Sequence, residues 1–203
     1  MITIIDYDMG NLGSLLNMIK HVGGKAKISS SPEEISESKK IILPGVGRMD
    51  MGIKKLKDTK IDKAIHHASS SKQTKILGVC LGMHLLFEYG EEGKTNGLGL
   101  LKGRVSKFSF KENEKLKIPH MGWNKVNFSR DSNFFSSLQN EGYFYFVHSY
   151  HVLCQDKSNI AATCNYGYNF TCAVESDGII GAQFHPEKSH TNGKHFYQKF
   201  INF

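Results

Sequence analysis

The sequence predicts an α/β protein built on a doubly wound, mostly parallel sheet, with an antiparallel, strand-rich C-terminal half. Three features of the 203-residue chain support this prediction. As far as about Tyr89, short apolar runs alternate with stretches of helical periodicity, which is typical of a parallel sheet covered by helices on both faces. From Gly97 onward, apolar runs follow one another with turn residues between them, as antiparallel strands do. The third feature is a cysteine between two glycines, at the point where one of the parallel strands is expected to become a helix.

The first half of the chain gives a regular succession of strands and helices. Its predicted strands are Ile2–Ile5, Lys25–Ser29, Lys40–Leu43 and Lys75–Val79. Between the first two strands, apolar residues recur at helical spacing from Leu12 to Val22, and Gly23 ends that helix. Ser31 before Pro32 indicates the start of a second helix, with serine as the N-cap and proline in the first turn. A helical stretch that resumes near residue 61 precedes the fourth strand.

The second half of the chain is predicted to consist mainly of strands. These are Leu100–Phe110, Gly122–Phe128, Gly142–Val152, Ile160–Asn165 and a hairpin over Thr171–Phe184. Asp177-Gly178 is a strong signal for the two-residue turn of that hairpin. A short helix over Lys194–Phe203 is expected at the end. Because no repeat, low-complexity tract or linker interrupts the chain, residues 1–203 are interpreted as a single domain.

Composition and charge exclude several classes of protein. The four cysteines lie far apart and form no C-x-x-C pair, so they indicate neither a disulfide framework nor a zinc site, and we expect no metal or other cofactor. The formal net charge is +7, but the lysines are scattered and no aromatic-basic motif accompanies them, so nucleic acid is not an expected partner. The N-terminus lacks a basic signal region, and no apolar run approaches the roughly 18 residues that span a bilayer. We therefore expect no membrane association and a cytoplasmic location.

Gly78-Val-Cys80-Leu-Gly82 has the spacing of a nucleophile elbow, with cysteine as the nucleophile. A sharp strand-to-helix turn brings neighbouring backbone so close to the positions two before and two after Cys80 that a Cβ would clash there, which explains both glycines. The turn also places the sulfur at the first turn of a helix, where unpaired amide groups favour a thiolate. An isolated cysteine at a strand end is more often a small core residue. The paired glycines favour a nucleophile.

His185 and Glu187, which follow the last predicted strand, are the candidate base and its orienting group. Pro186 favours an extended conformation for His185, in which alternate residues point the same way. A carboxylate beside an imidazole fixes its tautomer and stabilises its charged form, while the other ring nitrogen withdraws the thiol proton. The amide of Leu81 and the loop Pro44–Gly47, at the end of a neighbouring strand, are the candidate donors of an oxyanion hole.

Together these motifs resemble the class I, or triad, glutamine amidotransferases. Further segments make the chain similar to the glutaminase subunits of imidazole glycerol phosphate synthases; they are Asp6-Tyr7, Gly10-Asn11, Ile118–Asn124, Phe146–Tyr150 and Phe184–Ser189. The similarity runs in matching order from Ile2 to the final helix. It implies that glutamine is split into glutamate and ammonia through a thioester at Cys80.

The resemblance also implies roles for single residues. The catalytic triad would be Cys80, His185 and Glu187, and the oxyanion hole would involve Val46, Gly47 and Leu81. The glutamine pocket would include Gly45, His84, His148, Ser149 and Tyr150. One of these positions departs from the family pattern, which usually continues Gly-Met-Gln after the nucleophile where this chain has Gly-Met-His84. Because a helical side chain four residues on leans back towards the N-terminus, His84 should reach the pocket, either as a weaker or rearranged glutamine ligand or only as a space-filling residue.

The resemblance implies a partner, because nothing in the chain looks like a phosphate-binding cyclase site. The expected partner is a (β/α)8 barrel cyclase subunit that uses the ammonia. Trp123 and Lys188 are the candidate docking residues. Trp123 lies in a stretch with neither helical nor alternating pattern, tryptophan is enriched in interfaces, and Lys188 follows Glu187 directly.

Three other interpretations remain open from the sequence. A similar subunit could supply ammonia for the amidation of a surface sugar, and the sequence does not separate the two acceptors. A cysteine hydrolase or peptidase of related fold is a second alternative, against which the segments Ile118–Asn124 and His148–Tyr150 argue. The third is an inactive regulatory subunit, for which the departure at His84 is the only support.

Overall fold

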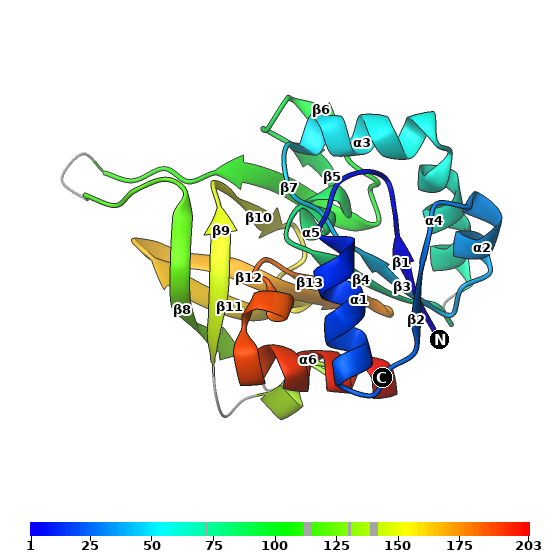
Figure 1. Ribbon diagram of the computed structural model, residues 1–203. Helices are drawn as coiled ribbons and strands as arrows, with labels where there is room; N and C mark the ends of the chain where they lie inside the picture. The colour runs from blue at the N-terminus through cyan, green and yellow to red at the C-terminus, as the bar shows by residue number, and fades with distance from the viewer. Residues whose placement is uncertain (72, 112–114, 130, 139–141) are drawn as a thin grey trace.

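A branched sheet with helices on both faces forms the centre of the protein (Figure 1). The structure is a computed structural model, and it describes residues 1–71, 73–111, 115–129, 131–138 and 142–203. The main path of the sheet runs in the order β2-β1-β3-β4-β13-β12-β10-β7-β5-β6, and β11, β8 and β9 branch from it at β12. In the described part of the chain, no helix is long and apolar enough to cross a membrane. The predicted fold class is confirmed.

Parallel strands make up the first part of this sheet. They are β2 (Ala26–Ser29), β1 (Ile2–Ile5), β3 (Lys40–Leu43), β4 (Lys75–Val79) and β13 (Ile179–Ala182). The helices are α1 (Leu12–His21), α2 (Pro32–Ser36), α3 (Met49–Asp58), α4 (Ile61–Ser70), α5 (Leu81–Leu85) and α6 (His190–Asn202). Ser31 caps α2 by accepting a hydrogen bond from the amide of Glu34, as its sequence predicts. The parallel strands that the sequence predicts are therefore confirmed, and β13 joins them from the far end of the chain.

The second part of the sheet is mostly antiparallel. Its strands are β12 (Tyr168–Ser176), β10 (Tyr150–Cys154), β7 (Leu101–Lys107), β5 (Phe87–Gly90), β6 (Thr95–Asn96), β11 (Ile160–Tyr166), β8 (His120–Phe128) and β9 (Tyr143–His148). Short 3₁₀ helices accompany them within the described ranges: η1 (Ser136–Leu138), η2 (Lys157–Asn159) and η3 (Pro186–Lys188). Asp177 and Gly178 both have positive φ, at 44° and 85°, so the predicted two-residue turn between β12 and β13 is confirmed.

The prediction of one strand over Gly142–Val152 is wrong. The segment forms two strands, β9 and β10, which separate at Ser149 because they pair with different neighbours. Strand β9 pairs with β8, whereas β10 pairs with β7 and β12. The carbonyl of Ser149 accepts a hydrogen bond from the amide of Phe108, the residue that follows β7. The final helix also begins earlier than predicted, at His190, and β5 and β6 were not anticipated.

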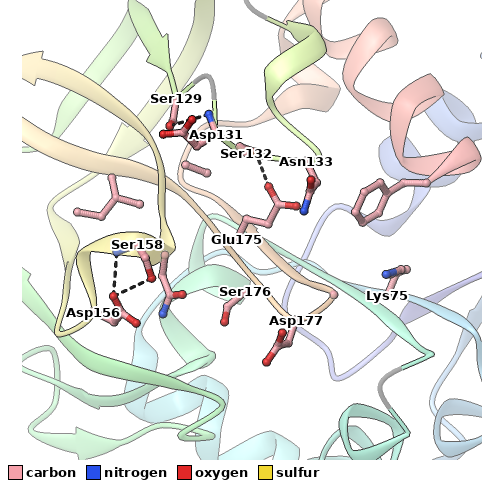
Figure 2. A pocket seen from close by; sticks show the side chains of 15 residues that line it. Lys75, Ser129, Asp131, Ser132, Asn133, Asp156, Ser158, Glu175, Ser176 and Asp177 are labelled. Atoms are coloured by element: carbon pink, nitrogen blue, oxygen red, sulfur yellow. Dashed lines mark hydrogen bonds between the residues drawn. The ribbon is translucent and has the colours of Figure 1, made fainter.

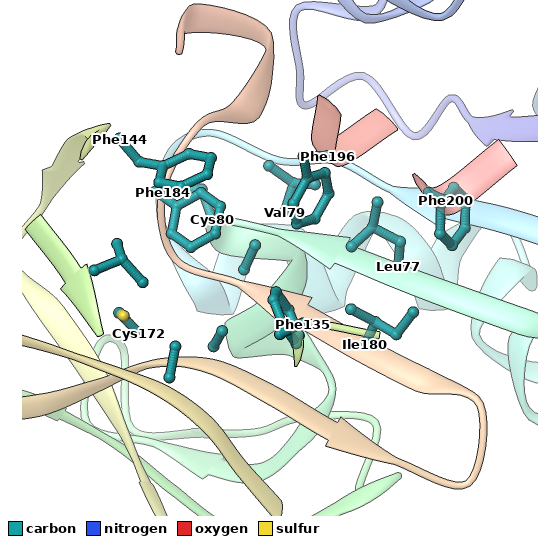
Figure 3. Close-up of a cluster of buried hydrophobic side chains, with 14 of the residues drawn as sticks. Leu77, Val79, Cys80, Phe135, Phe144, Cys172, Ile180, Phe184, Phe196 and Phe200 are labelled. Carbon is teal, nitrogen blue, oxygen red and sulfur yellow. The ribbon is translucent and has the colours of Figure 1, made fainter. Parts of the chain in front are cut away.

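The apolar core lies in two clusters, one on each face of the parallel strands. One packs under α1 and α6 and is rich in aromatic rings, such as Phe144 and Phe184 with ring centroids 4.1 Å apart (Figure 3). The other packs under α2, α3, α4 and α5. Cys80 belongs to the aromatic cluster, so the cysteine is held by a rigid packed wall.

Candidate active site

Cys80 occupies a strained turn between β4 and α5. It has φ 54° and ψ −110°, a conformation that side-chain-bearing residues rarely adopt and that is concentrated at functional sites. Its amide donates to the carbonyl of Ala182 at 2.7 Å, which ties the turn to β13. A Cβ at Gly82 would collide with the carbonyl oxygen of Leu43, and one at Gly78 would lie 2.7 Å from the carbonyl oxygen of Gly82. Both glycines are thus required by close backbone approach.

His185 and Glu187 lie against this turn from the segment that follows β13. The Nδ1 of His185 and the Oε1 of Glu187 are 2.8 Å apart, and both side chains are largely buried. Among the described residues, Nε2 of His185 is buried without a hydrogen-bond partner, and Cys80 lines the same cavity and is one of the two groups that raise the pKa of this ring. The structure therefore brings the three candidate catalytic side chains together in the order thiol, imidazole, carboxylate.

The backbone of His185 is fixed by the neighbouring strand β9. Its amide donates to the carbonyl of Tyr145 at 2.9 Å, and its carbonyl accepts from the hydroxyl of Ser189 at 2.6 Å. His185 itself is extended, as Pro186 predicts, but the following residues turn into η3. Glu187 consequently reaches the imidazole from a 3₁₀ turn and not from the alternation of an extended segment.

Electrostatics favour a charged His185. Burial by itself lowers the pKa of this histidine, but hydrogen bonds and charge interactions with Cys80 and Glu187 outweigh burial and raise the pKa to about 10. The imidazolium is therefore the stable form of His185 at neutral pH. Helix α5 has only five residues, so its dipole is a smaller source of positive potential at Cys80 than the charge of His185.

A cavity of about 310 Å³ opens beside Cys80 and contains most of the predicted site residues. Its lining includes Val46, Gly47, Leu81, His84, His148, Ser149, Tyr150 and His185. Gly45 and Glu187 are the exceptions among the predicted catalytic and pocket residues. Gly45 packs against Tyr7 and Leu81. Gly45 and Glu187 both line a smaller cavity of about 40 Å³, which also includes His185 and Lys188.

Trp123 and Lys188, the two predicted docking residues, lie outside the 310 Å³ cavity and are both exposed. The side chain of Trp123 is 47% exposed and stacks on His190 at 5.2 Å. Tyr145 links the pair, because its ring lies 6.2 Å from Trp123 and 5.7 Å from the ammonium group of Lys188. The two residues thus belong to one surface next to η3.

His84 is buried and already has a polar partner. Its Nε2 lies 2.7 Å from the Oε1 of Gln183, a fully buried residue whose Nε2 lies 3.9 Å from the sulfur of Cys80. Burial lowers the pKa of His84 to about 4, so the ring is neutral at physiological pH. A neutral ring that donates through Nε2 has only an acceptor left, at Nδ1. His84 therefore offers a ligand fewer hydrogen-bonding groups than the glutamine amide of the family pattern, which has both a donor and an acceptor.

A chain of hydrogen bonds supports the bend between β9 and β10 behind the cavity. The carbonyl of Tyr150 accepts from Nδ1 of His148 at 2.8 Å, so Nε2 of His148 must accept from Nδ1 of His120, 2.9 Å away. Nε2 of His120 in turn accepts from the side-chain amide of Asn124 at 3.2 Å. Burial lowers the pKa of His120 to about 4 and that of His148 well below its usual value, which keeps both rings neutral. This chain fixes the backbone of Tyr150 at the cavity wall.

Three site residues were missed by the sequence reasoning. Glu92 contributes a carboxylate to the cavity lining, and its Oε2 accepts from the amide of Met49 at 3.0 Å. Tyr197 in α6 lies with its hydroxyl 3.5 Å from Oε2 of Glu187, and Gln183 contacts Cys80. Only Gln183 carried a local signal, since it lies two residues before His185 and alternation in an extended segment puts both on one side.

A second cavity of about 480 Å³ lies at the opposite end of β4 and is lined mainly by polar side chains (Figure 2). It holds Asp131, Asp156, Asp177 and Glu175, and the amide of Phe134 donates to Glu175 at 3.1 Å. Neither a cysteine nor a histidine is among its lining residues. The smaller cavity at Cys80 is therefore the candidate active site.

The sequence is similar to known proteins over its full length. Residues 3–203 match the family described as glutamine amidotransferase class-I. The chain is 48% identical over 201 residues to the imidazole glycerol phosphate synthase subunit HisH 2 of Methanococcus maripaludis, covering 99% of this chain and 98% of that protein. It is 45% identical over 205 residues to subunit HisH of the same synthase from Sulfurimonas denitrificans, covering 100% of this chain and 98% of that protein.

Solved structures of low sequence identity share the fold. A structure described as a glutamine amidotransferase superposes with a TM-score of 0.73 at 16% identity and covers 99% of both chains. The structure of PurLQS from Thermotoga maritima gives a TM-score of 0.73 at 18% identity, covering 99% of this chain and 97% of that one.

Proposed function

This chain belongs to the class-I glutamine amidotransferases, and we propose that it is the glutaminase subunit of an imidazole glycerol phosphate synthase, splitting glutamine into glutamate and ammonia for histidine biosynthesis. The observation that carries the proposal is the grouping of three side chains: Cys80 and His185 both line the 310 Å³ cavity, and Glu187 lies 2.8 Å from the Nδ1 of His185. Full-length identity of 48% to the M. maripaludis subunit supports this reaction and pathway, and argues against a cysteine peptidase.

Cys80 is the proposed nucleophile of the first step. The thiolate attacks the side-chain carboxamide carbon of glutamine, and the carbonyl oxygen becomes an oxyanion. The proposed donors to that oxyanion are the backbone amides of Gly47 and Leu81, because both residues line the cavity next to the sulfur. When the C–N bond breaks, Nε2–H of His185 protonates the leaving nitrogen, so ammonia departs and a thioester remains at Cys80.

Water completes the cycle. Neutral His185 takes a proton from a water molecule that attacks the thioester carbon, and the C–S bond then breaks to give glutamate and the Cys80 thiolate. Glu187 accepts a hydrogen bond from Nδ1 of His185 and stabilises the imidazolium. The products are glutamate and one molecule of ammonia, and the resting ion pair is restored.

Glu92 is the proposed anchor for the α-ammonium group of glutamine. It supplies a carboxylate to the cavity wall, and an ammonium group pairs with a carboxylate more strongly than with a neutral acceptor. The backbone around Ser149 and Tyr150, held by the histidine chain, would fix the other end of the amino acid.

A (β/α)8 barrel cyclase is the proposed partner, docking on the surface formed by Trp123, Tyr145 and Lys188. The exposure of Trp123, its proximity to η3 and the nearby 40 Å³ cavity support this placement. Glutaminase activity should be weak in the isolated chain and rise when the partner binds its own ligand, because ammonia released without an acceptor is lost to water. Reorientation of a peptide bond in the loop around Val46 and Gly47 is the proposed way in which the partner would raise the activity. Gly47 has a φ of 105°, which a glycine adopts without strain.

Docking is tested by measuring the affinity for the cognate cyclase and the glutaminase activity in its presence. Trp123→Ala and Lys188→Ala should each weaken binding or activation. Ile28→Ala, which removes a comparably exposed apolar side chain from the edge strand β2, is the matched control and should behave as wild type. Wild-type binding and activation in both Trp123→Ala and Lys188→Ala would place the partner elsewhere.

The function itself is tested by assembling the chain with its cognate cyclase and comparing two ammonia sources. Wild type should form imidazole glycerol phosphate with either glutamine or added ammonium salt. Cys80→Ala should lose synthesis from glutamine and keep synthesis from ammonium. Glutamine use by Cys80→Ala would contradict the role of Cys80, and an amidated sugar as product would move the chain to the surface-sugar alternative.

A further inference from the structure

Gln183 is a polar side chain at the nucleophile for which the proposed reaction gives no role. It is fully buried, follows β13 directly, and its amide nitrogen lies 3.9 Å from the sulfur of Cys80. Its amide oxygen lies 2.7 Å from Nε2 of His84. A buried amide is expensive unless its polar atoms have partners, and both partners here belong to the candidate site.

The two contacts determine which way the amide of Gln183 points. The pKa of His84 is lowered to about 4 by burial, so the ring is neutral and either donates or accepts at Nε2. If Nε2–H donates to Oε1, the NH₂ group faces the sulfur and gives an attractive contact with a thiolate. The reverse orientation would place the amide oxygen against the thiolate, where the two negative groups repel.

We propose that Gln183 is a further catalytic residue that donates an amide N–H to the Cys80 thiolate, and that His84 is the positioning residue that holds the amide in this orientation. The proposal rests on the proposed glutaminase function for its purpose. An amide cannot give up its proton, so it stabilises the thiolate both before attack and when the thioester breaks, whether or not His185 holds its proton.

The other ionisable groups near the sulfur of Cys80 interact with it, or with its neighbours, by other means than the amide contact of Gln183. His185 approaches from the segment after β13 and carries the positive charge of the ion pair. Tyr7, after β1, is buried and donates its hydroxyl to the carbonyl of Pro44 at 2.6 Å, so it stays neutral. His84 acts from α5 through Gln183. Charge repulsion with His151 also lowers the pKa of His84, and burial keeps the pKa of His148 well below its usual value.

The test measures how the rate of alkylation of Cys80 by iodoacetamide depends on pH, followed on the peptide that contains Cys80. Burial raises the pKa of Cys154 to about 11 and that of Cys164 to about 12, so those thiols react slowly below pH 9. Gln183→Met keeps the side-chain length without the amide and should raise the midpoint by about one pH unit. Gln155→Met makes the same change at an exposed position and should leave the midpoint at the wild-type value.

A second pair of variants tests the role of His84. His84→Gln keeps a donor for the oxygen of Gln183 and should retain the wild-type midpoint. His84→Met, of similar length but without a donor, should raise the midpoint by about half a pH unit. Because His84 acts through Gln183, the double variant His84→Met with Gln183→Met should match Gln183→Met alone.

Unchanged midpoints in Gln183→Met and His84→Met would overturn the proposal, and additive shifts in the double variant would overturn the part assigned to His84. If Gln183→Met does not fold, the comparison of His84→Met with His84→Gln decides: a midpoint raised only in the methionine variant supports the proposal, and equal midpoints contradict it. Glutamine hydrolysis by the wild-type complex is measured in parallel. Its absence would contradict the proposed function, while the alkylation profile judges the amide contact separately.

Discussion

His185 and His84 line the same cavity and are buried to nearly the same degree, with 3% and 4% of their surfaces exposed, yet they carry different charges. The pKa of His185 is raised to about 10, whereas that of His84 is lowered to about 4. Burial opposes the charged form in both rings. The difference lies in their partners, since His185 has a thiol and a carboxylate and His84 has the neutral amide of Gln183.

The comparison shows how one cavity holds a charged and a neutral imidazole side by side. In the proposed reaction, a charged His84 would repel the imidazolium and the ammonium group of glutamine, while a neutral His185 could not protonate the leaving nitrogen. Two histidines thus have different charge states, one charged and one neutral, because their side chains contact different partners. The following predictions alter one partner at a time.

Removing either member of the ion pair should have the largest effect. Cys80→Ser weakens the negative partner of His185, and His185→Asn removes the positive one. Both should reduce the kcat for glutamine hydrolysis by at least about 10⁴-fold, because nucleophile and base act as a unit. Steady-state glutaminase assays of the complex check this, with ammonium-dependent synthesis as the control. A loss smaller than tenfold in either variant would break the assignment of the pair.

Glu187→Gln should cost about a hundredfold less than loss of the nucleophile, because an orienting carboxylate supplies only part of what the pair supplies. The variant keeps the size of the side chain but removes the charge 2.8 Å from Nδ1 of His185. The acid form of His185 should then lose its proton at lower pH, which shifts the basic limb of the kcat/KM profile downward. An unchanged profile would show that Cys80 alone sets the charge of His185.

Acid should destabilise the fold through the neutral histidines. The folded-state pKa of His84 is about 4, below its ordinary value of 6.5, so between these values the unfolded chain binds more protons than the folded one. The contribution of His84 to the free energy of unfolding is therefore fully present above pH 6.5 and decreases as the pH falls from 6.5 towards 4. Between pH 7 and pH 5 the free energy of unfolding should fall by about 2 kcal/mol. Urea denaturation at the two pH values should show a smaller loss in His84→Gln than in wild type. Equal losses would mean that His84 is already charged in the folded protein.

The smallest expected effect concerns glutamine binding by His84. His84→Gln restores an amide with both a donor and an acceptor, so it should lower the KM for glutamine by up to about fivefold, the equivalent of one hydrogen bond, with kcat unchanged. An unchanged or higher KM would indicate that the histidine is an adapted ligand or a space-filling residue. Glutaminase assays of the wild-type and His84→Gln complexes over a series of glutamine concentrations show whether the KM falls, stays or rises.

The sequence was most informative where local geometry leaves few choices. The elbow at Cys80, the hairpin turn at Asp177-Gly178 and the cap at Ser31 each depend on residues close together in the chain, and each is found where predicted. The break at Ser149 could not be predicted, because it arises from a change of pairing partner between distant strands.

The partners of the site residues were harder to predict than the residues themselves. Glu92 and Tyr197 come from β-hairpin and helical segments that approach the site only in the folded chain. The sequence placed His84 near Cys80, and the structure has it in the lining of the same cavity, but nothing local indicated that Gln183, 99 residues away, would contact its Nε2. Tertiary contacts of this kind decide the charge of a buried ring, and they have no signature in local spacing.

The central claim is that His185 is charged while His84, in the same cavity, is neutral. Its most direct test is a titration of the ring nitrogens by NMR. The protein is labelled with ¹⁵N-histidine, the resonances of His185 and His84 are assigned from His185→Asn and His84→Gln, and spectra are recorded from pH 6 to pH 8. The structure predicts that both nitrogens of His185 remain protonated throughout, while His84 stays neutral with its proton on Nε2. A neutral His185 at pH 7, or a His84 that is protonated there, would contradict the account.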